Sequence, residues 1–163
     1  MIKNIVQPNI IVITENLRLK KYDGTYDFAL KWYQDRETLL LVNGNEKIYD
    51  LKQLKAMYEY LAENGEEYII EYKEKDMFVP IGDVTLMEED CPIVIGDKRY
   101  RGKGIGKQVI MTMVNRAKEL GFPCMKVDEI YSYNIASRKI FEACEFEKYK
   151  DAEKGSRYIK KLK

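Results

Sequence analysis

The residues with the clearest chemical purpose are three glycines and their basic neighbours in segment 101–107, Arg-Gly-Lys-Gly-Ile-Gly-Lys. Glycines at alternate positions, Gly102, Gly104 and Gly106, allow tight turns and a close approach of the backbone to a ligand. A long amphipathic pattern follows, so we expect a helix whose free N–H groups and positive dipole end face that ligand. The segment therefore predicts a binding site for a pyrophosphate group.

Two common phosphate motifs do not fit this spacing. A Walker A loop requires Gly-x-x-x-x-Gly-Lys-Ser/Thr, but Gly102 lies one residue too close to Gly106, and Gln108 replaces the hydroxyl residue. A dinucleotide fingerprint requires Gly-x-Gly-x-x-Gly near the start of a βαβ unit, whereas this loop has Gly-x-Gly-x-Gly and lies past the middle of the chain. We therefore expect neither NTP hydrolysis nor nicotinamide binding.

Composition excludes several further classes of protein. The chain has 163 residues, no histidine, and a formal net charge of +1 from 28 Lys and Arg against 27 Asp and Glu. Without histidine, Ser-His-Asp and Cys-His hydrolases are excluded, and a general base must be another side chain or a water that it holds. The near-zero net charge provides no overall attraction to nucleic acid. We expect no nucleic-acid partner.

The cysteines and the N-terminal segment indicate a reduced, soluble protein. Cys91, Cys124 and Cys144 form no Cys-x-x-Cys pair, so we expect reduced core residues and no metal site. Apolar runs such as 10–13 are far shorter than the roughly 20 residues of a membrane span, and no signal-peptide layout is present. We expect a cytoplasmic protein without a membrane partner, with one domain over 1–163 and an uncertain role for 1–16.

Hydrophobic spacing predicts the elements that position the loop. Helical patterns occupy 26–32, 50–64, 104–120 and 135–143. Runs typical of strands occupy 17–22, 68–72, 78–86, 92–95 and 125–130, with one or two closing strands between 146 and 162. The second and third of these runs predict a hairpin around 73–76. Trp32 and Tyr33 are expected in the core, with an aromatic pair near a substrate entrance as the alternative. The whole pattern predicts an α+β (mixed α/β) fold.

Two motifs resemble one known family. The segment 100–107, with Arg-x-x-Gly-x-Gly from Arg101, resembles the acyl-CoA-binding loop of the GCN5-related N-acetyltransferases. About thirty residues on, the block 134–146 resembles that family's Asn-x-x-Ala/Ser-x-x-x-Tyr/Phe-x-x-x-Gly-Phe pattern. The segments 17–19 and 31–35 are similar to the branch with ribosomal-protein and aminoglycoside acetyltransferases. The resemblance implies a central mixed, mostly antiparallel sheet flanked by helices, with acetyl-CoA as cosubstrate.

The resemblance also implies which residues bind the cofactor. In the family, loop amides and the following helix surround the pyrophosphate, and a backbone N–H on the preceding strand polarises the thioester carbonyl. Asn134 resembles the residue that bonds the pantetheine arm, with a helix N-cap as the alternative role. The implied cofactor-binding residues are Val94, Ile95, Arg101, Gly102, Lys103, Gly104, Ile105, Gly106, Lys107, Asn134 and Ser137.

Acidic side chains are the candidates for the general base. A substrate ammonium has a pKa near 10, so a carboxylate or a carboxylate-bound water should remove its proton. We rank Glu129 first and Asp97 second as catalytic residues, and for each a solvated surface charge is the alternative. The other candidates are Glu88, Glu89, Asp90 and Asp128.

The chain departs from the family pattern at two positions. Phe141 stands where many members carry a tyrosine that protonates the leaving thiolate. Tyr131 and Tyr133 are candidates for that role. We favour water or no dedicated acid, because a thiol pKa near 8.5 makes thiolate a tolerable leaving group. Glu145 replaces the usual glycine of the second block, which affects a turn.

Charge placement completes the functional hypothesis. Basic residues surround the loop and the acidic run 88–90 precedes it, which indicates a basic face for CoA and an acidic rim for a cationic amine. We expect an N-acetyltransferase acting on a small aminoglycoside- or polyamine-like amine. The alternatives are a peptide or protein N-terminal acetyltransferase and a catalytically weak acyl-CoA-binding module; an anion- or RNA-binding protein is disfavoured by the charge. A monomer and a homodimer are both open.

Overall fold

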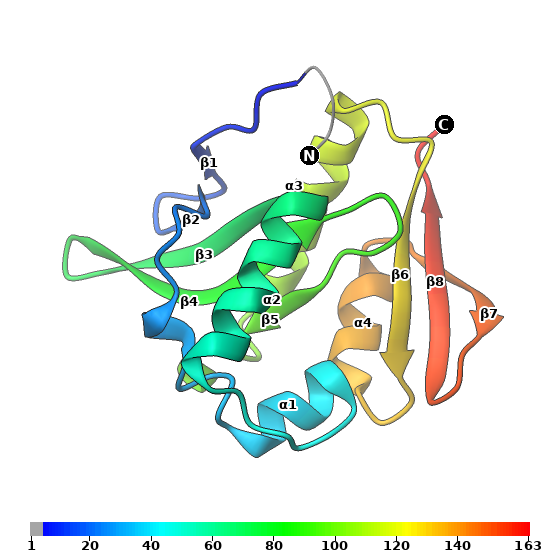
Figure 1. Cartoon of the computed structure of the whole chain (residues 1–163). Coiled ribbons are helices and arrows are strands. Elements are labelled where there is room, and N and C mark those ends of the chain that lie inside the picture. Colours follow the sequence, from blue (N-terminus) through cyan, green and yellow to red (C-terminus); the bar gives the residue numbers. More distant parts are fainter. Residues whose placement is uncertain (1–4) are drawn as a thin grey trace.

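Two antiparallel sheets lie beside one another in the computed structural model, which describes residues 5–163 (Figure 1). The larger sheet has the order β1-β2-β3-β4-β5, formed by Ile10–Val12, Leu17–Lys21, Glu66–Glu74, Met77–Leu86 and Ile93–Ile95. The smaller sheet has the order β6-β8-β7, formed by Cys124–Tyr131, Gly155–Lys161 and Glu147–Asp151. The predicted α+β fold is confirmed.

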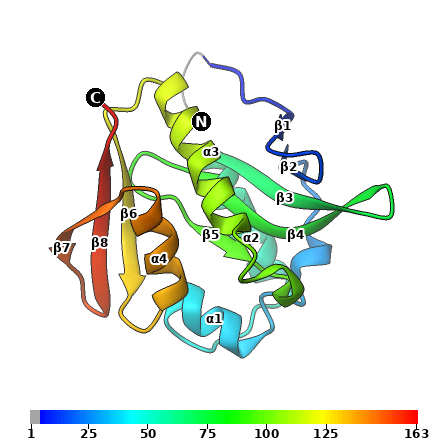
Figure 2. The same ribbon diagram turned by 180° about the vertical axis from the view of Figure 1, so that it is seen from behind.

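Helices cover both faces of the larger sheet. Figure 1 shows α2 (Leu51–Asn64) in front of it, and Figure 2 shows α3 (Ile105–Glu119) on the opposite side, with α4 (Ile135–Ala143) next to β6. The short α1 (Arg36–Asn43) lies below the gap between the two sheets. Single 3₁₀ turns occupy Asp27–Ala29 (η1) and Lys98–Tyr100 (η2). No helix within residues 5–163 is long and apolar enough to cross a membrane.

Successive side chains of each strand point to opposite faces of the larger sheet, which divides the core into two layers. On the α3 side, Ile70 and Val84 pack with Ile110, and this layer continues into the smaller sheet. On the α2 side, Ile69 and Val94 pack against α2 residues that recur at helical spacing. The cluster on this side also holds Trp32 and Tyr33, which confirms that both are core residues; its buried members are Ala29, Trp32, Tyr33, Leu39, Leu54, Tyr58, Leu61, Ile69 and Val94.

The structure corrects several predicted boundaries. The predicted helix over 26–32 is limited to η1, whereas α1 was not predicted. Both hairpin strands are longer than expected, because the turn needs only Lys75 and Asp76, whose positive φ angles of 47° and 67° fit a two-residue turn. Part of 1–16 has a defined role, since β1 pairs with β2; residues 1–4 lie outside the described part. All three cysteines are free, with Cys124 only half-buried.

The C-terminus of α4 explains the departure at Glu145. The N–H of Phe146 donates to the carbonyl of Phe141, and the N–H of Glu145 donates to that of Glu142, each over 3.0 Å. The Phe141 and Phe146 rings also touch, with centroids 5.1 Å apart. These contacts form a Schellman motif, which places Glu145 at the position that glycine usually occupies. Its φ of 68° is costly for a residue with a Cβ atom.

We expect Glu145→Gly to raise the free energy of unfolding by about 0.5–1 kcal/mol, because it relieves the left-handed backbone at the cost of an exposed ion pair with Lys160. Glu145→Ala is the matched control, since it removes the same ion pair but keeps a Cβ atom. Urea unfolding should rank Gly above both Glu and Ala. An Ala variant as stable as the Gly variant would contradict this explanation.

Candidate functional site

A cavity of about 200 Å³ lies between β5 and β6, the facing edges of the two sheets. The sheets are not paired here among the described residues, so the backbone of each edge is turned toward this space. Six predicted site residues from four segments line the cavity: Val94, Ile95, Arg101, Glu129, Asn134 and Ser137. Gly102 to Lys107 and Asp97 are not part of its lining.

The glycine loop enters α3 through two residues in left-handed conformation. Gly102 has a φ of 74° and Gly104, the N-cap of α3, has a φ of 79°. Among the described residues no side chain caps α3, so the N–H groups of its first turn are available for an anion. A Cβ atom at Gly106 would come within 2.6 Å of Ile140, so glycine here lets α3 approach α4 closely. This geometry fits the predicted pyrophosphate site.

The hydrogen-bond ladder decides which N–H groups of β5 face the cavity. Thr85 donates to the carbonyl of Pro92 over 3.0 Å, and the β4–β5 register pairs Asp83 with Val94. Because successive residues of an antiparallel strand direct their N–H and C=O groups to opposite sides, the N–H of Val94 points toward β4. The N–H of Ile95 points toward β6, as does its carbonyl, which accepts from Arg101.

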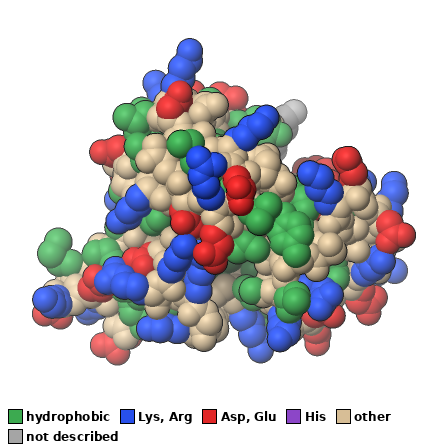
Figure 3. Space-filling model, turned by 90° about the horizontal axis from the view of Figure 1, so that it is seen from below, with side chains coloured by type: hydrophobic (Ala, Val, Ile, Leu, Met, Phe, Trp, Pro, Cys, Tyr) green, Lys and Arg blue, Asp and Glu red, His purple; other side chains and the backbone are tan. Residues whose placement is uncertain are grey.

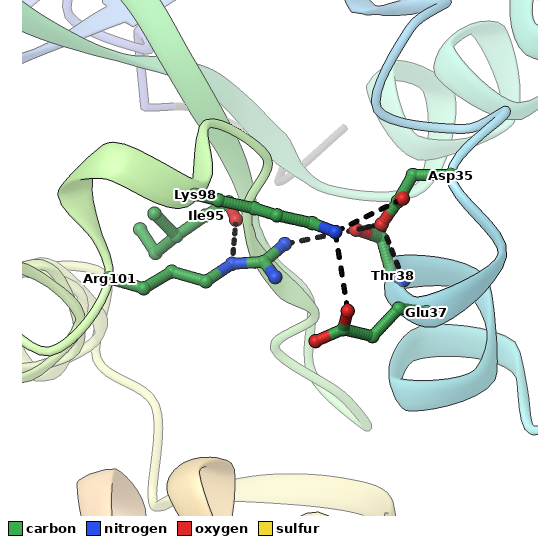
Figure 4. A network of polar contacts seen from close by, with 6 residues as sticks. All are labelled: Asp35, Glu37, Thr38, Ile95, Lys98 and Arg101. Atoms are coloured by element: carbon green, nitrogen blue, oxygen red, sulfur yellow. Dashed lines mark hydrogen bonds and ion pairs between the residues drawn. The ribbon is translucent and has the colours of Figure 1, made fainter.

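A polar network joins the glycine loop to the first turn of α1 (Figure 4). Arg101 donates from Nε to the Ile95 carbonyl over 2.8 Å and from Nη2 to the Thr38 hydroxyl over 3.0 Å. Lys98 forms ion pairs with Asp35 at 3.1 Å and Glu37 at 3.3 Å. Bonds from Thr38, followed by Lys98, lower the pKa of Asp35 to about 2. The Arg101 side chain therefore fixes β5 and α1 around the cavity.

The opposite end of α1 contacts the turn between β6 and α4. The Tyr133 hydroxyl donates to the Leu40 carbonyl over 2.5 Å, and Asn134 Nδ2 donates to the Leu41 carbonyl over 3.2 Å. Asn134 Oδ1 accepts from the Ser137 N–H, so Asn134 is also the N-cap of α4. Seen from below, this end of the molecule presents a group of hydrophobic side chains (Figure 3). Leu40, Tyr133 and Ile135 are among the exposed hydrophobic residues of these segments.

A second, larger groove of about 480 Å³ lies on the α2 side of β5. It shares Val42, Asp90, Pro92 and Val94 with the first cavity, so the two spaces meet at the segment that leads into β5. None of the described residues that line this groove is Lys or Arg. Its four carboxylates belong to Asp83, Glu89, Asp90 and Asp128.

Asp90 is the carboxylate at the junction of the two spaces. Its Oδ1 accepts the N–H of Cys91 over 2.9 Å and the N–H of Asp128 over 3.1 Å, which orients the group and leaves Oδ2 outside both bonds. Burial raises the pKa of Asp90, against the lowering effect of these two bonds. The sequence placed Asp90 among several acidic candidates but gave no reason to prefer it.

The two carboxylates ranked first from the sequence lie in different surroundings. Glu129 lines the first cavity, with Oε2 accepting the N–H of Lys154 over 2.6 Å. Asp97 caps η2 and forms an ion pair with Arg99, 2.8 Å between Oδ2 and Nη2. Arg99 holds the pKa of Asp97 below its ordinary value. The structure therefore brings Glu129 to the cavity and Asp97 into a local turn.

The two tyrosines predicted as possible proton donors to the leaving thiolate lie in different surroundings. Phe141 and Tyr131 both line the first cavity, whereas Tyr133 is bound to α1. The Tyr131 and Tyr133 rings stack with centroids 5.7 Å apart. Burial, followed by the charge of Glu129, raises the pKa of Tyr131, so its hydroxyl stays protonated at neutral pH. Tyr131 is the phenol that borders the cavity.

A buried carboxyl lies beyond the groove. Glu67 is 1% exposed, and neither of its oxygens has a hydrogen-bond partner within the described residues. Burial, followed by the charge of Asp83, raises the pKa of Glu67 from 4.5 to about 9. Glu67 is therefore protonated in the folded protein at neutral pH.

This shift predicts a pH-dependent stability. Because the folded-state pKa lies above the unfolded value, the folded state binds an extra proton between these pH values, and the free energy of unfolding falls as pH rises, by up to about 1.4 kcal/mol per pH unit. Glu67→Gln should flatten this slope between roughly pH 6.5 and 8.5, while the exposed control Glu88→Gln should keep it. Urea titrations across this range check the slopes, and parallel curves for wild type and Glu67→Gln would refute the assignment.

The uncapped first turn of α3 and the cavity beside it are consistent with an anion-binding site, and comparison with known proteins identifies the family. Residues 31–146 match the model of the acetyltransferase (GNAT) family. The match covers most of the chain, so this protein belongs to that family, and the predicted acetyltransferase class is confirmed. No curated protein sequence matches the chain.

Solved structures share the fold at low sequence identity. A domain from Methanocaldococcus jannaschii DSM 2661 superposes with a TM-score of 0.80 at 20% identity, covering 90% of this chain and 98% of that one. A structure of AAC(6')-Ib in complex with ribostamycin and coenzyme A gives 0.75 at 13%, covering 91% and 94%. The ribosomal-protein-S5-alanine acetyltransferase from Vibrio fischeri gives 0.70 at 14%, covering 93% and 96%.

Proposed function

We propose that this protein transfers the acetyl group of acetyl-CoA to a primary amine of a small cationic molecule. The observation that carries the proposal is the meeting of two cavities at Asp90 and Val94, one beside the glycine loop and one lined by carboxylates. Acetyl-CoA supplies an activated thioester, and a reaction needs the amine to reach it from a separate entrance. The two spaces share four lining residues but differ in charge, because the described lining of the first includes Arg101 and that of the second includes no lysine or arginine.

The donor side of the site is built from backbone groups. The N–H groups of Ile105, Gly106 and Lys107 lack helical acceptors and suit the pyrophosphate, with Lys103 and Lys107 adding positive charge. The Ile95 N–H, turned toward the space between β5 and β6, can stabilise negative charge on a carbonyl oxygen. Substitution of the Ile95 side chain should therefore reduce acetyl transfer less than a change that displaces the backbone of β5.

The acceptor side needs a group that removes a proton from an ammonium. Asp90 lies where the two spaces meet, its orientation is fixed by two backbone N–H groups, and its raised pKa makes it a stronger base than an exposed aspartate. We therefore place Asp90 first as general base and keep Glu129 as the second candidate. Tyr131 borders the same space and can protonate a leaving thiolate.

A small cationic acceptor fits the groove better than a neutral one. Its described lining holds four carboxylates and neither lysine nor arginine, and Tyr49 and Tyr60 add aromatic surface. Carboxylates attract an ammonium, and aromatic rings favour a cation above their faces. A peptide N-terminus remains the alternative acceptor, because it also carries an ammonium group that carboxylates attract.

The experiment incubates the purified protein with acetyl-CoA and a panel of polyamines, aminoglycosides and peptides, and follows release of free thiol. We expect release above the hydrolysis background with polyamines or aminoglycosides. Release with peptides alone would favour the N-terminal acetyltransferase. Tight CoA binding without release for any amine would favour a binding module and refute the proposal.

A further inference from the structure

The four carboxylates of the acceptor groove differ in their partners. Glu89 pairs with Lys126 at 3.2 Å, and Asp128 lies 3.7 Å from the Arg157 guanidinium. The ion pairs of the described residues include neither Asp83 nor Asp90. Two carboxylates therefore face the groove without a cation of the protein beside them.

Asp83 is held rigidly at the inner wall of the groove. It lies on β4 and is 3% exposed, in the core layer beneath α2. The hydroxyl of Tyr33 donates to Oδ2 over 2.8 Å, and the hydroxyl of Tyr58 donates to the same oxygen over 2.9 Å. Neither bond uses Oδ1. Because both phenol rings are themselves buried, the carboxylate has a single defined orientation.

The charge of Asp83 results from two opposed effects. Burial raises its pKa, and the hydroxyl groups of Tyr33 and Tyr58 lower it, with a result of about 6. The titratable groups around it are these two tyrosines, whose pKa values are raised well above 10, and Glu67, whose proton keeps it neutral. Asp83 is therefore mostly ionised at neutral pH.

Asp83 lies on the strand next to β5, where we place the transfer of the acetyl group. Its cross-strand partner on β5 is Val94, which lines both cavities. The N–H of Met87, four residues beyond Asp83 along the chain, donates to the carbonyl of Asp90, so the backbones of Asp83 and Asp90 lie about 13 Å apart at the strand rise of roughly 3.3 Å per residue. A molecule that reaches both carboxylates therefore needs two cationic groups joined by an extended aliphatic linker.

We propose that Asp83, oriented by the hydroxyl groups of Tyr33 and Tyr58, binds a second ammonium of the acceptor and selects diamines or polyamines over monoamines. The inference rests on the proposed function, since Asp90 receives the reacting amine. In this arrangement one amine loses its proton at Asp90 and attacks, while the other stays charged at Asp83. Asp83 is thus a specificity residue and takes no part in proton transfer.

The test compares putrescine with n-butylamine, which has the same carbon chain and a single amine. Wild-type enzyme should show a kcat/KM for putrescine at least about tenfold higher, the effect of one charge-assisted hydrogen bond. Asp83→Asn should reduce this ratio toward one, mainly by raising KM for putrescine. Tyr58→Phe, which removes one donor to Asp83 and keeps the ring, should reduce it by a smaller factor.

Each outcome decides the inference. Equal use of both amines by the wild type, or a preference unchanged in Asp83→Asn, overturns it while leaving acetyl transfer intact. Failure of the proposed function is distinct, because then the wild type releases thiol with neither putrescine nor n-butylamine. If Asp83→Asn does not fold, as checked by circular dichroism, Tyr58→Phe decides: an undiminished preference overturns the inference, and a reduced one supports it.

Discussion

Asp90→Asn is expected to lower kcat by about 10²- to 10³-fold at saturating acetyl-CoA, the usual effect of removing a general base. Asparagine keeps the shape of the side chain, and its carbonyl oxygen can still accept the N–H groups of Cys91 and Asp128. The fold and the affinity for CoA should therefore stay unchanged. Steady-state kinetics with a diamine, together with calorimetric titration of CoA, separates the two effects.

Glu129→Gln is the matched control, because Glu129 also lines the first cavity but lies outside the acceptor groove. We expect it to change kcat far less than Asp90→Asn does. Since burial raises the pKa of Asp90, kcat/KM of the wild type should rise with pH through a base-dependent limb that Asp90→Asn lacks. The reverse ranking of the two variants would reassign the general base to Glu129.

Arg116→Met is expected to lower the free energy of unfolding by about 3–5 kcal/mol, the largest stability effect that we predict. Arg116 on α3 holds Glu66 at the start of β3 through two bonds of 2.8 Å, from Nε and from Nη2. Tyr68 donates to the same carboxylate over 2.7 Å. The ion pair is nearly buried, so loss of the guanidinium leaves an uncompensated charge between helix and sheet.

Two further variants separate this explanation from a loss of packing. Glu119, the exposed second partner of Arg116, should matter little, and Glu119→Gln should cost less than about 1 kcal/mol. Combining Arg116→Met with Glu66→Leu removes both charges and should recover much of the loss. Chemical unfolding measures all three. A double variant as unstable as Arg116→Met alone would show that packing, and not the unpaired carboxylate, determines the cost.

Hydrophobic spacing and capping residues in the sequence predicted the longer helices correctly but missed the short α1. The predicted 135–143 helix agrees with α4. The start of α2 was predicted from Asp50, its N-cap, whose side chain forms a reciprocal capping box with Gln53. The missed α1 has only eight residues. Its boundary signals were present in Asp35, which caps the first turn, and in Gly44, which ends the helix with a φ of 72°.

The site was predictable only in part, because its two cavities arise from contacts between distant segments. The glycine loop and Asn134 were found from their motifs, and the structure brings Arg101 and Asn134 to one cavity. The motifs could not show which of the acidic candidates is best placed to act as the general base. Packing decides whether a carboxylate forms an ion pair with a neighbour, as Asp97 does with Arg99, or accepts only backbone N–H groups, as Asp90 does in the described structure. The spacing of residues along the sequence does not reveal which carboxylates form ion pairs.

The central claim is that acetyl donor and amine approach from opposite sides and meet at the segment from Asp90 to Ile95. A crystal structure with CoA and putrescine bound together tests it most directly. We expect the CoA sulfur between β5 and β6 beside the Ile95 N–H, and the diamine in the groove with one nitrogen within hydrogen-bond distance of Asp90. A diamine bound outside that groove, or CoA bound away from the glycine loop and β5, would contradict the account.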